Sequence, residues 1–220
     1  MADSRENNPS YERILAAGKD LFIEQGFPST SMEAIAQRAS VVRATVYNNF
    51  KDKEAILAEI MRRYFEGYVE IPRRLREEAR PEQTSFELIE EMIRSAILWR
   101  IENAELRPLV DLSKHLPASP WPSLNGAADA AMHGWVLEIH RREAERGLLR
   151  EGVDLEFATH ALYLMIEAVI ASFDIGASRR RVNQAVRQLT LLNWHALYRA
   201  EPDQPSERQA ASPIARARPG

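Results

Sequence analysis

Five side chains in one short segment have the chemistry to read base edges in DNA. An arginine such as Arg43 can donate two hydrogen bonds to guanine O6 and N7, and an asparagine such as Asn49 can bond adenine N6 and N7. Ala44 and the methyl group of Thr45 can contact the methyl group of thymine. Asn48 is an additional candidate for a base contact. The chemistry of these side chains therefore suits contacts to bases if a helix carries them into a major groove.

Such contacts need a short helix that can enter the groove, and the local pattern predicts one. Residues 30–39 and 43–49 have the pattern of two short helices joined by a tight turn, which are the dimensions of a helix-turn-helix. Thr30 and Glu33 have the spacing of a capping box at the start of the first helix. A longer amphipathic helix over residues 10–26, with Ser10 as its cap, precedes them.

The segment ILAAGKDLFIEQGFPSTSMEAIAQRASVVRATVYNNFKDKEAIL resembles the DNA-binding region of the TetR family of bacterial transcriptional regulators. The resemblance covers roughly residues 11–60. The matching residues are Ile14, Leu15, Ala17, Leu21, Phe22, Gly26, Phe27, Thr30, Ser31, Ile35, Ala36, Ala39, Tyr47, Phe50, Lys53, Glu54 and Leu57. The resemblance implies a DNA-binding regulator.

The resemblance also implies roles for single residues. The base-reading candidates Arg43, Ala44, Thr45 and Asn49 match family positions that reach into the major groove. Three further residues match positions that contact phosphates: Ser31, Tyr47 and Lys53. Lys53 and the open N–H groups after Asp52 are placed to meet an anion. Phosphate contacts position the protein on DNA, whereas base contacts select the sequence.

The turn departs from the family pattern at three positions. Where the family commonly has glycine, then serine, and then glycine early in the reading helix, this chain has Ser40, Val42 and Ala44. Either Ser40 adopts an unfavourable turn conformation or the turn adjusts, at a cost of about 1 kcal/mol. Val42 cannot cap the reading helix through its side chain. We therefore expect the helix-turn-helix, which is the reading head of the protein, to be less ordered in the absence of DNA.

Composition sets the class of protein. The chain has 220 residues, 45% hydrophobic and 28% charged, which is typical of a globular protein. It contains no cysteine, which excludes disulfides, thiolate metal sites and cysteine catalysis. The N-terminus lacks a signal-peptide pattern, and the longest apolar run, residues 161–173, is too short to span a bilayer. We expect a soluble, cytoplasmic protein whose net charge of −3 confines any DNA-binding surface to a local patch.

Apolar residues recur at spacings of three and four almost throughout, which predicts an all-α fold of about nine helices. Beyond residue 50, the helices expected cover residues 52–72 with a kink at Pro72, 86–104, 108–115, 124–146, 155–175 and 182–198, with Asp52 and Asp154 as caps. We expect a helix-turn-helix domain over residues 1–53, a larger helical domain over 54–200 and a disordered tail over 201–220.

The resemblance implies that the larger domain binds a small molecule and forms a homodimer through its last two long helices, at about 155–175 and 182–198. The first of these is apolar nearly all round, as expected for a helix that also packs on a partner. Seven residues are candidates for a partly apolar ligand pocket: Phe86, Met92, Trp99, His115, Trp121, Trp135 and Tyr163. For the aromatic residues and Met92, simple packing in the core is the alternative, and for His115 the alternative is a solvated surface position.

Other classes of protein have weaker support. Glu-x-x-His, His-Glu-x-x-His and Gly-x-Ser-x-Gly patterns are absent from the sequence, so we expect no enzyme, cofactor or metal site. His133 and His140, seven residues apart, leave a metal-responsive regulator open, and a helical protein-interaction module without DNA binding is the other alternative. The favoured hypothesis is a dimeric regulator, most simply a repressor, that binds a near-palindromic DNA operator and is released by a small, partly apolar effector.

Overall fold

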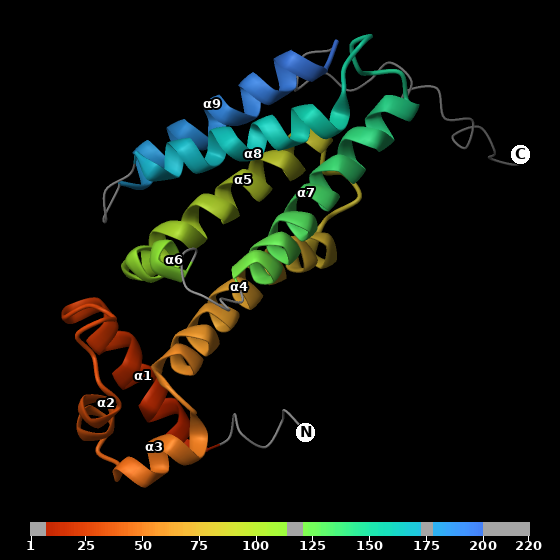
Figure 1. The fold of residues 1–220 in the computed structure, drawn as a ribbon. Helices are drawn as coiled ribbons and strands as arrows, with labels where there is room; N and C mark the ends of the chain where they lie inside the picture. Colours follow the sequence, from red (N-terminus) through yellow and green to blue (C-terminus); the bar gives the residue numbers. More distant parts are fainter. Residues whose placement is uncertain (1–7, 114–120, 173–177, 200–220) are drawn as a thin grey trace, which may run out of the picture. The chain divides into compact units, whose positions relative to one another are not determined.

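A computed structural model describes residues 8–113, 121–172 and 178–199 of the chain, apart from the side chains of 121–125 and 128–129. The predicted all-α class is confirmed: the described residues form nine α-helices, one 3₁₀ turn and no strand (Figure 1). The elements are α1 (Pro9–Glu24), α2 (Met32–Arg38), α3 (Arg43–Asn49), α4 (Lys53–Glu78), α5 (Ser85–Glu102), η1 (Ala104–Leu106), α6 (Arg107–Ser113), α7 (Trp121–Glu145), α8 (Leu155–Ala171) and α9 (Arg179–Leu197).

The chain forms two compact units. The first unit contains residues 1–73 and 99–132, and the second contains residues 74–98 and 133–220. The division falls inside α4, α5 and α7, so these helices contribute to both units. The functional boundary that we predict at residue 53 remains a prediction, and the predicted tail lies outside the described residues.

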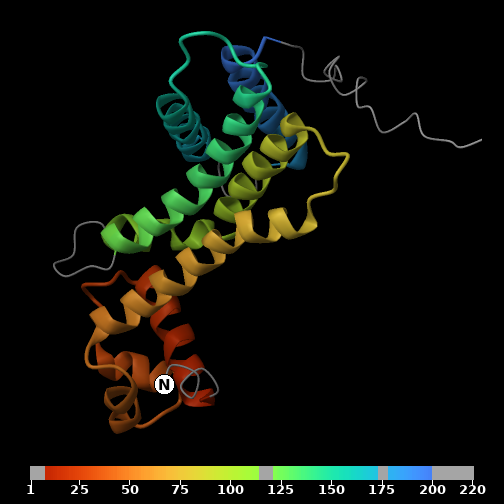
Figure 2. The same cartoon turned by 90° about the vertical axis from the view of Figure 1, so that its right-hand side faces the viewer.

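Within the first unit, α1, α2 and α3 lie beside the start of α4 (Figure 2), and they pack around a small apolar core. Ile14, Ile35 and Val46 have no solvent exposure, one from each of the three helices. Tyr11 of α1 stacks on Phe50, which ends α3, with ring centroids 4.8 Å apart. This core fixes the position of α3, the predicted reading helix.

Two predicted caps in this unit are wrong. The cap of α1 is Asn8, whose Oδ1 accepts a hydrogen bond from Ser10 N at 3.0 Å, because Pro9 occupies the first helical position, where no N–H is needed. The cap of α2 is Ser31, whose Oγ accepts from Ala34 N at 3.1 Å. The buried Thr30 hydroxyl instead donates to Gly26 O at 2.9 Å, so the predicted capping box with Glu33 does not form.

The fourth helix begins as predicted but ends later. Asp52 Oδ1 accepts from Ala55 N at 2.8 Å and caps the helix. The helix continues through Pro72 to Glu78, so the predicted end at Pro72 is wrong. Proline removes one helical hydrogen bond, but burial of Ile71 and Leu75 on either side stabilises the continuation.

The second unit contains α8 and α9 side by side (Figure 1). Asp154 caps α8 as predicted, accepting from Phe157 N at 3.0 Å. At the end of α9, Trp194 stacks on Tyr198 with ring centroids 3.8 Å apart and belongs to a buried cluster with Phe86. The start of α5 has a capping box that we did not predict. Glu87 N donates to Thr84 Oγ1 at 3.2 Å, and Thr84 N donates to Glu87 Oε2 at 2.8 Å.

Across the described ranges, no helix is long and apolar enough to cross a membrane.

Candidate nucleic-acid interface

Of the two alternatives for the turn between α2 and α3, the structure shows the strained one. Ser40 has a φ of 53°, and within the described chain it is the one residue other than glycine with positive φ. Val41 N donates to Ala36 O at 3.0 Å and closes the turn. Val42 supplies the extended residue before α3 and makes no side-chain cap to the helix, in the part of the chain that the structure describes. The reading helix therefore begins without a cap and after a strained residue.

We expect Ser40→Gly to stabilise the protein by about 1 kcal/mol relative to Ser40→Ala, because glycine adopts positive φ without a Cβ clash. Urea unfolding of both variants and the natural protein measures the difference. Ser40→Ala is the matched control, since it removes the hydroxyl and keeps the Cβ. Equal midpoints for the two variants would show that the turn is not strained.

The third helix buries one face and exposes the other. Val46 is fully buried in the core, whereas Arg43, Ala44, Tyr47 and Asn48 are exposed. The structure thus brings these four predicted DNA contacts onto one open surface. We name this surface, with its half-buried neighbours Thr45 and Asn49, the α3 face.

Arg43 is held loosely at the start of the α3 face. Its Nη2 lies 2.7 Å from Glu33 Oε1, and its guanidinium lies over the Tyr47 ring, 5.3 Å from the centroid. The Arg43 and Glu33 side chains are 64% and 53% exposed, and such surface pairs contribute little to stability. A guanine or a phosphate can therefore replace Glu33 as the partner of Arg43.

Asn49 is less open than its position in the sequence suggests. Its Nδ2 donates to Thr45 O at 2.7 Å, and its Oδ1 accepts from Asn8 Nδ2 at 3.5 Å. A contact to adenine requires Asn49 to exchange at least the bond to Thr45. Sequence reasoning missed this arrangement because Asn8 lies 41 residues away along the chain.

Lys53 is engaged by the loop before α2. Its Nζ donates to three carbonyl oxygens, those of Phe27 at 2.8 Å, Thr30 at 3.0 Å and Pro28 at 3.1 Å. These bonds use all three donors of the ammonium group, so a phosphate contact requires one carbonyl to be released. Ser31 follows this loop and is exposed, with its hydroxyl on the first turn of α2. Lys53 therefore fixes the loop that presents Ser31.

Two of the predicted ligand-pocket residues line different cavities among the described residues, and the shared pocket remains a prediction. Trp99 lines a cavity of about 320 Å³ in the first unit, together with residues of α1 and α4. Trp135 lines a cavity of about 390 Å³ in the second unit, together with the end of α4 and part of α5. Phe86 and Met92 are buried, and Phe86 packs on Trp194.

Of the other three pocket candidates, Tyr163 has a described side chain. Tyr163 of α8 packs on the ring of His133, with ring centroids 4.8 Å apart. His115 and the Trp121 side chain lie outside the described residues. His140, the second histidine of the metal hypothesis, bonds the Tyr198 hydroxyl through Nδ1 at 2.7 Å. Among the residues that the structure describes, no three metal-ligating side chains lie together.

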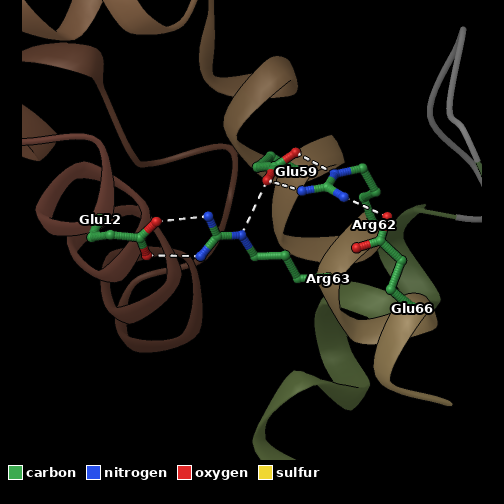
Figure 3. Close-up of polar contacts among 5 residues, drawn as sticks. All are labelled: Glu12, Glu59, Arg62, Arg63 and Glu66. Atoms are coloured by element: carbon green, nitrogen blue, oxygen red, sulfur yellow. Dashed lines mark hydrogen bonds and ion pairs between the residues drawn. The ribbon is translucent and has the colours of Figure 1, made fainter. Parts of the chain in front are cut away.

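A network of ion pairs that we did not predict joins α1 to α4 (Figure 3). Arg63 of α4 donates to both carboxylate oxygens of Glu12 of α1, each at 2.7 Å, and to Glu59 at 3.0 Å. Glu59 also accepts from Arg62, which in turn pairs with Glu66. The spacing within α4 is visible in the sequence, but the bond to Glu12 spans 51 residues and needs the fold.

Comparisons with known proteins agree on the N-terminal region. A family model described as "Bacterial regulatory proteins, tetR family" matches residues 14–60. The uncharacterized HTH-type transcriptional regulator YvkB of Bacillus subtilis (strain 168) is 22% identical over 152 residues, which cover 68% of this chain and 76% of that protein.

Solved structures share the fold over most of the chain. The TetR family transcriptional regulator PfmR from Thermus thermophilus has a TM-score of 0.66 and 25% identity, covering 85% of this chain and all of that one. The transcriptional regulator FadR from Bacillus subtilis, solved in complex with stearoyl-CoA, has a TM-score of 0.65 and 18% identity, covering 86% of this chain and all of that one. The HTH region and the helical fold thus point to one family.

Proposed function

We propose that this chain, whose residues 14–60 match the model of the TetR family of bacterial transcriptional regulators, is a repressor of that family that binds a near-palindromic operator as a homodimer. A small effector releases it from DNA in the cytoplasm. Relatives in this family are transcriptional regulators rather than enzymes.

The observation that carries the proposal is the α3 face. A short helix exposes Arg43, Ala44, Tyr47 and Asn48 while Val46 anchors it in the core. Arg43 reads guanine through its fork of donors, with Asn48, Asn49, Ala44 and Thr45 as further base contacts. A helix of this size fits the major groove.

Phosphate contacts position the α3 face on DNA. Tyr47 is 43% exposed and presents a hydroxyl beside Arg43, and Ser31 presents a second one at the start of α2. Lys53 supports this role by ordering the loop before Ser31, and it contacts a phosphate only by releasing one of its carbonyl partners. Such contacts carry affinity for any sequence.

The proposed dimer uses α8 and α9. Phe157, Leu164 and Leu192 are exposed to 73%, 54% and 58%, and Met165 to 36%. Large apolar side chains gathered on two adjacent helices favour an interface, because water contact with them is unfavourable. We propose that a second copy of the chain covers them across a twofold axis.

The effector is proposed from the cavities within the helical region. Each of the two cavities described above has an aromatic lining residue, Trp99 or Trp135, together with charged groups. This mixture suits a partly apolar ligand with a polar group. FadR, which shares the fold, was solved with stearoyl-CoA, so the fold accommodates small-molecule ligands.

Operator binding is tested with a site selected from random DNA by the natural protein and mapped by footprinting. We expect Arg43→Ala to weaken the selected site by about 1–3 kcal/mol and to relax preference at one base pair in each half-site. Tyr47→Phe, which removes only the hydroxyl, should weaken selected and random DNA by the same factor. Fluorescence anisotropy on both DNAs measures the contrast.

Two results would contradict this assignment. Equal effects of Arg43→Ala on selected and random DNA would remove its role in base reading. A footprint without twofold symmetry would remove the dimeric operator, whose half-sites should lie about 34–36 Å apart.

A further inference from the structure

A cavity in the first unit lies against the face of α1 that carries Lys19. Its volume is about 320 Å³, at the lower end of the range for small-molecule sites. Lining residues come from one stripe of α1, from α4 and from the end of α5, and include Leu15, Ala16, Lys19, Ile60, Arg63 and Trp99. All of them belong to the same compact unit as α3.

The lining combines an apolar surface with charged side chains. Leu15, Ile60 and Trp99 supply hydrocarbon and aromatic surface. Of the two cations in the lining, Arg63 is bonded closely to Glu12 and Glu59, whereas Lys19 lies 3.8 Å from its partner Glu105. The occupant that complements this surface has an apolar body and one negative charge.

Lys19 is the cation with unused capacity. Its salt-bridge partner, Glu105, places Oε1 3.8 Å from Nζ, which is longer than a hydrogen bond. Both side chains are partly exposed, so this pair is weak. A carboxylate bound in the cavity can accept a direct hydrogen bond from Lys19, which Glu105 does not do at this distance.

We propose that this cavity is an effector site for a small amphipathic monocarboxylate, with the carboxylate bound to Lys19 and the apolar body packed on Leu15, Ile60 and Trp99. The cavity lies beside the Glu12–Arg63 ion pair, whose two 2.7 Å bonds join α1 to α4 (Figure 3). A second anion beside Arg63 competes with Glu12 for the guanidinium. Occupancy therefore loosens the link between α4 and the helix that packs on α3.

Binding is tested without DNA, using benzoate as the probe and ligand-observed NMR titration as the measurement. Lys19→Met keeps the length of the side chain and removes the charge, and we expect it to weaken benzoate at least tenfold. Ala16→Leu fills the cavity from an exposed helical position and should abolish binding. Arg13→Met removes a charge from another, exposed position of α1 and should stay within twofold of the natural protein.

The neutral probe benzyl alcohol separates charge from apolar packing. It should bind at least tenfold more weakly than benzoate, and Lys19→Met should not change its affinity. The site is excluded if millimolar benzoate shows no saturable binding, or if Lys19→Met and Ala16→Leu bind it as the natural protein does.

The regulatory part rests on the proposed function and has its own measurement. Saturating benzoate should lower the affinity of the natural protein for the selected operator at least tenfold, and that of Ala16→Leu by less than twofold. An unchanged operator affinity with benzoate bound would overturn the effector role. Absence of operator binding before benzoate is added would instead overturn the proposed function, and the NMR titration would still decide the site.

Discussion

Replacing Leu164 and Leu192 together by glutamate is expected to convert the protein to a monomer and to lower operator affinity at least a hundredfold. The two side chains are 54% and 58% exposed on the adjacent helices α8 and α9. In a twofold interface each appears twice, so the variant buries four carboxylates where four leucines had packed. Loss of the second reading head removes the avidity of two linked contacts, which is worth about 10²–10⁴ in affinity.

Sedimentation velocity and anisotropy on the selected operator measure this prediction together. Ala127→Glu with Ala144→Glu adds the same charge at exposed positions of α7 and is the matched control. The control should remain dimeric and bind the operator within a few fold of the natural protein. A Leu164→Glu, Leu192→Glu protein that stays dimeric would place the interface elsewhere.

A second large effect, a loss of folding stability in mild acid, is expected from His140. This side chain of α7 is fully buried, and burial lowers the pKa of its imidazole from 6.5 to about 4. Its Nδ1 lies 2.7 Å from the Tyr198 hydroxyl, and the buried Glu143 stands one turn along α7, paired with Ser85 and Arg146. Burial also raises the pKa of Tyr198, so its hydroxyl stays protonated and can donate to Nδ1.

The direction of the change in stability with pH depends on whether the folded or the unfolded state takes up the proton first. As pH falls below about 6.5 the unfolded chain protonates this histidine, whereas the folded protein resists until about pH 4. The contribution of His140 to the free energy of unfolding therefore falls progressively across this interval and reaches its limit below about pH 4. The total loss from this one group is about 3 kcal/mol, since each unit of pKa corresponds to about 1.4 kcal/mol.

Urea unfolding between neutral pH and pH 4 measures the loss. His140→Gln removes the titration, so its unfolding free energy should depend less on pH than that of the natural protein. His195→Gln replaces an exposed histidine of α9 in the same way and is the matched control. Parallel pH curves for His140→Gln and the natural protein would show that burial of this imidazole does not govern acid stability.

The sequence alone determined the features that depend on neighbouring residues. Spacings of three and four predicted the helices and the helix-turn-helix, since helical neighbours are set by local geometry. The caps at Asp52 and Asp154 were predicted correctly for the same reason. The strained conformation of Ser40 was one of two alternatives that followed from the family resemblance, and the structure selects it. The face of α3 also follows from local spacing once Val46 is assigned to the core.

Only the tertiary structure decided features that join distant residues. Lys53 was expected to meet phosphate, yet its donors are engaged by carbonyls 23–26 residues earlier in the chain, and no periodicity encodes the direction of those carbonyls. The bond from Arg63 to Glu12 and the cavity beside Lys19 likewise depend on how α1 lies on α4. Aromatic composition predicted a pocket but could not separate Trp99, which lines a cavity, from Phe86, which packs in a core. Both rings are apolar, and only the packing around each determines whether open space remains.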